Sequence, residues 1–205
     1  MSAGLPEEGA DARLRSGLYR VVTGLDENGR SVVALEGPPG AVYQWPDGGG
    51  LYEIWADAGG PLNRHARVDP ACGPVRLCPA EGATRIRWFT IMPPGSPPAS
   101  TAEVERAVEE GFAALGASEA RPDTRLHPAM HLTQTLDVII IVRGKVRLRL
   151  DAGERLLGPG DVVIQRGTNH AWICEGDEPA LMVAVLLSRP FDSAPPVSKS
   201  QGAGP

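Results

Sequence analysis

The chain has 205 residues, which is long enough to bury a full core. Its formal net charge of −5 argues against a nucleic-acid or anionic-membrane partner. No apolar run approaches the roughly 20 residues of a membrane span, and the acidic start lacks the apolar stretch of a signal peptide. The three cysteines lack metal-finger spacing, so we expect reduced thiols in a cytoplasmic protein, with a Cys72–Cys78 disulfide as the alternative.

The N-terminal half, residues 18–99, is predicted to be a β extension that packs on the rest of the protein. Asn28-Gly29 marks a hairpin turn between two apolar runs. In the segment 84–92, Ile86 and Trp88 lie opposite Arg85 and Arg87. Strands are expected near 19–36, on either side of this turn, and the segments 51–57 and 84–92 alternate as strands do.

A single helix is predicted over residues 100–116. Ser100 and Glu103 form a capping box, and Gly116 marks its end. Its apolar stripe consists of Val104, Val108, Phe112 and Leu115.

The C-terminal half, residues 117–190, is predicted to form the β core. Short apolar runs alternate with turn signals between residues 130 and 188, which favours an antiparallel sandwich or small barrel. The ends, 1–17 and 191–205, are rich in polar and small residues, and we expect them to be disordered tails.

The head of this core carries polar side chains on alternate positions, which share one face of a strand. They are His131, Thr133, Thr135 and Asp137, in the stretch MHLTQTLD. A face of this composition that points inward is a metal site, a polar substrate pocket or the remnant of one.

Two segments resemble the two motifs of the cupin superfamily. The first runs from His131 through Asp137 to Gly144, and the second is GDVVIQRGTNHAW, residues 160–172. This resemblance implies an all-β fold: a cupin-like antiparallel β-barrel, or double-stranded jelly roll, with an N-terminal strand extension and one or a few short helices. The superfamily hosts many reactions, so the motifs indicate the fold more strongly than the chemistry.

The resemblance also implies a metal-ligand set that this chain carries only in part. His131 and His170 match metal-binding histidines, and Asp137 stands where a metal-binding Glu is usual. Thr133 replaces a second histidine, Gln165 replaces a proline and Cys174 replaces an asparagine. The remaining two imidazoles and one carboxylate have the composition of an Fe(II) facial triad. We leave open whether one divalent metal (Fe, Zn, Mn or Ni) or no cofactor is bound, because Asp is shorter than Glu.

The candidate site is therefore His131, Asp137 and His170, as catalytic residues or as metal ligands. Without a metal, the two histidines are hydrogen-bonded pocket residues. The candidate substrate-binding residues are Thr133, Thr135, Gln165 and Trp172. Gln165 has a structural alternative, tying down the following turn, and Trp172 has barrel packing as its alternative.

Three functions remain open at this point. The first is a biosynthetic enzyme that uses acid–base or metal-assisted chemistry for cyclisation, isomerisation, dehydration or decarboxylation of a small molecule. The second is an iron-dependent dioxygenase, and the third is a non-catalytic ligand-binding cupin. We expect a homodimer with N-terminal strands at its interface.

Overall fold

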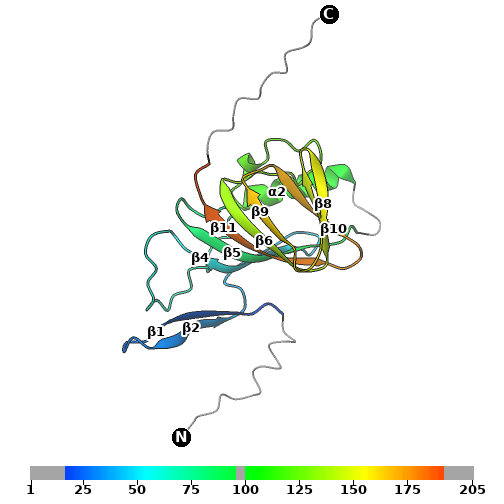
Figure 1. The fold of residues 1–205 in the computed structure, drawn as a ribbon. Coiled ribbons are helices and arrows are strands. Elements are labelled where there is room, and N and C mark those ends of the chain that lie inside the picture. The colour runs from blue at the N-terminus through cyan, green and yellow to red at the C-terminus, as the bar shows by residue number, and fades with distance from the viewer. Residues whose placement is uncertain (1–16, 96–99, 192–205) are drawn as a thin grey trace, which may run out of the picture.

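The computed structural model describes residues 17–95 and 100–191. Both expected tails, except Gly17 and Phe191, lie outside the described residues. The described chain is mostly β, with every strand pairing antiparallel, as the sequence predicts (Figure 1).

The strands form two sheets that face each other and a separate hairpin. The larger sheet has the order β3 (Val42–Gln44), β4 (Gly50–Ala56), β5 (Thr84–Ile91), β11 (Ala180–Ser188), β6 (Thr135–Arg143) and β9 (Val162–Arg166). The smaller sheet has the order β10 (His170–Glu175), β7 (Lys145–Leu150) and β8 (Gly153–Leu157). The hairpin consists of β1 (Arg20–Leu25) and β2 (Ser31–Gly37) and stands apart from both sheets (Figure 1).

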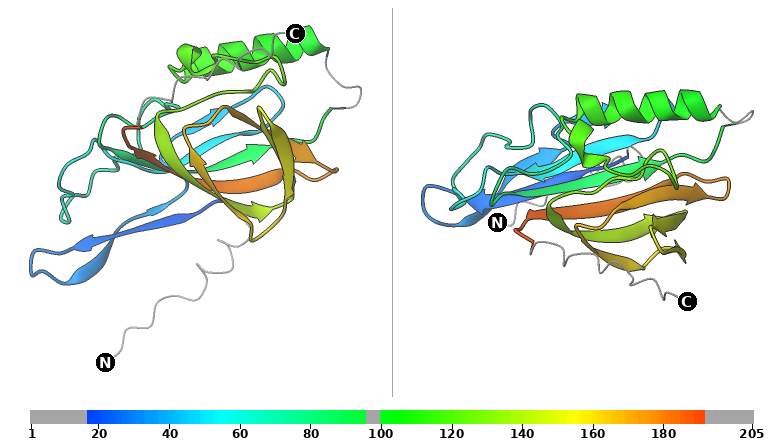
Figure 2. Two further views of the ribbon diagram at one scale, coloured as in Figure 1. Left: turned by 45° about the horizontal axis from the view of Figure 1, so that its top comes forward. Right: turned by 90° about the horizontal axis from the view of Figure 1, so that it is seen from above.

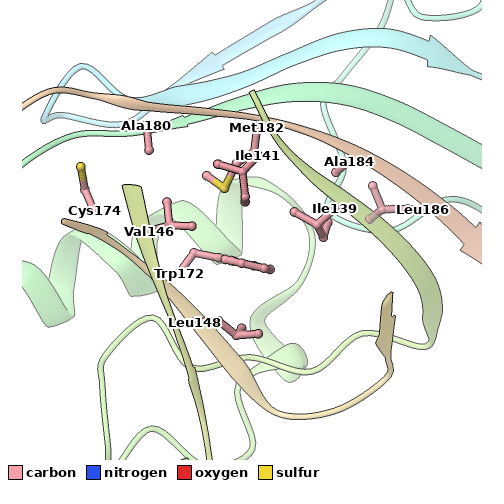
Figure 3. Close-up of a cluster of buried hydrophobic side chains, with 10 residues drawn as sticks. All are labelled: Ile139, Ile141, Val146, Leu148, Trp172, Cys174, Ala180, Met182, Ala184 and Leu186. Carbon is pink, nitrogen blue, oxygen red and sulfur yellow. The ribbon is translucent and has the colours of Figure 1, made fainter. Parts of the chain in front are cut away.

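The main core lies between the two sheets, where inward positions of each strand alternate with outward ones. Ile141 and Met182 are almost fully buried, and Trp172 reaches from β10 into the space between the sheets (Figure 3). Burying one such aliphatic side chain contributes about 1.5–3 kcal/mol to stability, so this cluster holds the sheets face to face.

The helix α2 (Thr101–Ala114) begins where the capping box predicts. Ser100 Oγ accepts from the backbone N–H of Glu103, and the Glu103 carboxylate accepts from the backbone N–H of Ser100. Leu115 caps its end, and Gly116 follows with a φ of 67°. The helix lies to one side of the strands in both views of Figure 2. A short 3₁₀ helix, η1 (Ser118–Ala120), then leads toward the barrel strands.

The N-terminal half does more than pack on the barrel, because β4 and β5 hydrogen-bond into its larger sheet through β11. The division into extension, helix and barrel core stays a prediction. Within the described ranges, no helix combines the length and apolar character needed to cross a membrane.

The expected strand face from His131 to Asp137 is regular only in its second half. Strand β6 begins at Thr135, whereas His131 lies in an isolated bridge with His170. The three cysteines are free thiols, so the alternative Cys72–Cys78 disulfide is not formed.

Candidate functional site

A cavity of about 840 Å³ lies between helix α2 and the inner faces of the sheets. Its wall is largely apolar, and helix α2 contributes the stripe predicted from its sequence. The polar side chains in that wall come from both sheets, from the segment before β6 and from the helix. They include His131, Thr133, Asp137, His170 and Arg87. A mostly apolar cavity with a few convergent polar groups is the usual form of a small-molecule site.

The backbone sets the two histidines side by side. The N–H of each residue donates to the carbonyl of the other, at 2.9 Å in both directions, so His131 and His170 face each other across an antiparallel bridge. Directly opposed residues in such a pair project to the same side. Their ring centroids are 4.3 Å apart, and the ring centroid of Phe112 on the helix lies 5.1 Å from that of His131, in an edge-to-face arrangement.

The hydrogen bonds of the two imidazoles fix which nitrogen carries the proton. His131 Nδ1 lies 2.9 Å from the Ala129 carbonyl, and His170 Nδ1 lies 2.8 Å from the Thr168 carbonyl. A carbonyl can only accept, so Nδ1 is the donor in both rings and each Nε2 keeps its lone pair. In its neutral form, each imidazole therefore offers Nε2 as a hydrogen-bond acceptor.

Burial keeps the two imidazoles uncharged. It lowers the pKa of His131, and it lowers the pKa of His170 to about 3, with the neighbouring His131 acting in the same direction. An imidazole near its ordinary pKa of 6.5 can move protons in both directions at neutral pH, and burial removes His170 from that role.

Asp137 is the group in this wall that titrates close to neutrality. Its side chain is 4% exposed, and burial raises its pKa from 3.8 to about 6, against the effect of the Thr135 hydroxyl and the Arg87 charge. Its Oδ1 has no hydrogen-bond partner. A buried carboxyl with a pKa near the working pH and a free oxygen is suited to general acid–base catalysis.

The predicted substrate-binding residues divide into two groups. Thr133 and Trp172 line the cavity, as expected. Thr135 and Gln165 are not among the residues that line it, and their part in substrate binding stays a prediction. Thr135 donates to the Thr133 hydroxyl at 2.7 Å, and Gln165 binds the backbone carbonyl of Thr168 at 3.0 Å. Thr135 therefore supports Thr133. Gln165 ties down the turn that follows it, which is the structural alternative predicted for this residue.

The donor set meets only part of what a metal ion requires. Both imidazoles have the arrangement of metal-bound histidines, with Nδ1 held by a carbonyl and Nε2 free. Nevertheless, the described residues contain no group of three His, Cys, Asp or Glu side chains placed to hold a metal ion. Asp137 therefore does not join His131 and His170, and the expected three-ligand set is not assembled. Two imidazoles fall short of the three protein ligands typical of a catalytic centre.

Sequence reasoning missed a buried ion group beside this site. Glu53 on β4 is fully buried, and its Oε1 lies 3.0 Å from Nη2 of Arg87 on β5. Arg85 completes the group, with Nη1 at 3.3 Å from Glu53 Oε2. The available signal was the alternation in residues 84–92: an arginine that alternates with Phe89 and Ile91 lies on their face, and both apolar residues line the cavity with Arg87.

Comparison with known proteins agrees with the interpretation of the motifs. The model of the cupin domain family matches residues 120–186, which include His131, Asp137 and His170. The chain is 50% identical over 44 residues to phomopsin biosynthesis cluster protein C' of Diaporthe leptostromiformis, covering 21% of this chain and 23% of that protein. It is 39% identical over 62 residues to the cupin-domain-containing oxidoreductase fogC of Aspergillus ruber, covering 28% and 30%.

These similarities are local. The matched part spans about a quarter of the length of the curated relatives. Among solved structures, a cupin 2 conserved barrel domain protein from Salinispora arenicola CNS-205 shows 16% identity over 70% of this chain and 79% of its own, with a TM-score of 0.36. A structural similarity this low supports no functional inference.

Proposed function

The chain is a member of the cupin superfamily, and we propose that it is an enzyme of secondary metabolism that moves a proton on a small, largely apolar molecule. The observation that carries this proposal is the cavity wall, which combines the carboxyl group of Asp137, with a pKa near 6, with two imidazoles and many apolar side chains. Relatives named for biosynthesis clusters support the metabolic setting. Isomerisation, cyclisation, dehydration and decarboxylation all include such a step.

In this proposal Asp137 is the proton carrier. Its free Oδ1 takes a proton from a substrate carbon or oxygen, the bond to hydrogen breaks toward the substrate, and the proton is later returned to another position. Nε2 of His131 and of His170 accept hydrogen bonds from substrate hydroxyl groups and orient them. The apolar wall excludes water, which strengthens these polar contacts.

Proton exchange tests this proposal without knowledge of the natural substrate. The protein is incubated in D₂O with a library of small carbonyl compounds and phenols, and deuterium uptake is read by mass spectrometry. We expect uptake with the wild type and loss of at least about 100-fold in His131→Ala and His170→Ala. His65→Ala is the matched control, because His65 is exposed and does not line the cavity. Equal uptake in all four proteins would contradict the proposal.

The second candidate is an iron-dependent dioxygenase, favoured by the oxidoreductase names of several relatives. The arrangement of His131 and His170 supports it, whereas the missing third ligand opposes it. Oxygen consumption that appears only after addition of iron(II) would replace the first candidate with this one. Ligand binding without exchange or oxygen uptake would leave the non-catalytic cupin as the function.

We place the protein in the cytoplasm in either case. The three free thiols are compatible with a reducing compartment.

A further inference from the structure

The guanidinium of Arg87 is a buried polar group whose bonding capacity is only partly used. Arg87 is 2% exposed and lines the cavity. Its Nη2 donates to the Arg76 carbonyl at 2.5 Å and contacts Glu53, whereas its Nε has no hydrogen-bond partner. An unsatisfied buried donor is costly, so a group in this position calls for a ligand or for another compensation.

The surrounding residues hold this guanidinium at the cavity wall. Glu53 lies opposite Arg87 on β4, and on the other side Arg87 is paired with Ala184 of β11. Ala184 has no side chain beyond Cβ, which leaves room over β11 for the long arginine side chain. The contacts to Glu53 are charge contacts, since neither carboxylate oxygen meets the geometry of a hydrogen bond.

The charges of the cavity wall decide what kind of ligand Arg87 can take. The described residues that line it include one arginine against three carboxylates, those of Asp47, Glu103 and Asp137. Glu53 offsets part of the charge of Arg87 and part of the charge of Arg85, which does not line this cavity. A ligand with a full negative charge would therefore meet one arginine and three carboxylates in the wall, whereas a neutral oxygen acceptor can use the remaining N–H groups of Arg87 without that repulsion.

We propose that Arg87 binds the carbonyl oxygen of the substrate, and that the substrate class is a neutral, largely apolar ketone or aldehyde. This inference rests on the proposed function, because Arg87 would make the proton on the carbon next to the carbonyl group more acidic. A cationic donor on a carbonyl oxygen stabilises the negative charge that develops there when a proton leaves the adjacent carbon. Asp137, in the same wall, is the group to receive that proton.

Three probes of similar shape test this inference by calorimetry: 2-acetylnaphthalene, the hydrocarbon 2-isopropenylnaphthalene and 2-naphthoate. We expect the ketone to bind the wild type at least about tenfold more tightly than either of the others. A ¹³C label in the carbonyl group should shift downfield on binding, which reports a hydrogen bond to that oxygen. Equal binding of ketone and hydrocarbon, or tighter binding of 2-naphthoate, would overturn the inference.

Arg87→Met should remove the preference for the ketone and the downfield shift. Arg147→Met should keep both, because Arg147 on β7 pairs with Glu154 and Glu175 and does not line the cavity. Because Arg87→Met leaves Glu53 with one cation fewer, Glu53→Gln/Arg87→Met serves as a second variant without the buried charge pair. If either variant folds and still prefers the ketone, the inference is overturned. The comparison of the three probes on the wild type does not depend on whether the variants fold.

The two proposals fail separately in this experiment. Arg87-dependent ketone binding without deuterium uptake at the acetyl methyl group would remove the proposed proton transfer and keep this inference. Deuterium uptake with equal binding of ketone and hydrocarbon would keep the proposed proton transfer and remove the inference about Arg87.

Discussion

Replacing Asp137 with asparagine should stabilise the protein at neutral pH. The carboxyl is 4% exposed and its pKa is raised from 3.8 to about 6 by burial. The folded state therefore holds the Asp137 proton more tightly than the unfolded state, and stability is lost as pH rises from about 4 to about 6. The difference between the two pKa values corresponds to a cost of about 3 kcal/mol above pH 6. The side-chain amide of the Asp137→Asn variant has a similar shape to the carboxyl and no such cost.

Urea unfolding of wild type and Asp137→Asn at pH 4 and pH 7.5 measures this effect. We expect similar free energies of unfolding at pH 4 and a variant more stable by up to about 3 kcal/mol at pH 7.5. The buried imidazoles of His131 and His170 act in the opposite direction, because their lowered pKa values favour the folded state as pH rises. Both proteins contain them, so their contribution cancels in the difference.

A variant that is less stable than the wild type at pH 7.5 would refute this reasoning. It would mean that Asp137 is ionised in the folded state and is stabilised there by the positive charge of Arg87, which lowers the pKa of Asp137. A stability difference that does not change between the two pH values would refute it as well, because the effect would then come from packing.

Three further predictions concern the turn, the assembly and the site. Gly167→Ala should cost about 2 kcal/mol in thermal unfolding, because φ is 58° and a Cβ would lie 3.1 Å from the Thr133 carbonyl; Gly158→Ala, which meets nothing within 4 Å, should cost little. Light scattering should give a dimer of twice 21.6 kDa, with the hairpin β1–β2, which exposes Val21, at the interface; a monomer at micromolar concentration refutes it. The far-UV circular dichroism of His131→Ala should match that of the wild type, so that lost exchange reports chemistry; a lost β spectrum would remove that interpretation.

The sequence predicted the fold because local signals and burial agree there. The capping box at Ser100 and the alternation in residues 130–188 each specify an element without help from distant residues. The convergence of His131 and His170 was predictable from two motifs whose spacing matches a known superfamily.

The electrostatics of the site were not predictable in the same way. The low pKa of His170 and the raised pKa of Asp137 arise from burial, which depends on the helix and sheets packed around them. Glu53 and Arg87 are 34 positions apart in the chain, and only the register between β4 and β5 brings the two residues together. The distances between His131, His170 and Asp137 also depend on the fold, and motif spacing alone does not show whether three side chains meet at one point.

The pH dependence of deuterium uptake into 2-acetylnaphthalene tests the central claim most directly, that a buried Asp137 carries the proton in this cavity. In the wild type the rate should rise with pH through an apparent pKa of about 6 and level off above it, since the ionised carboxylate is the base. In Asp137→Asn the rate should fall by at least about 100-fold and lose this step. An unchanged rate in the variant, or a wild-type profile without a step near pH 6, would contradict the account.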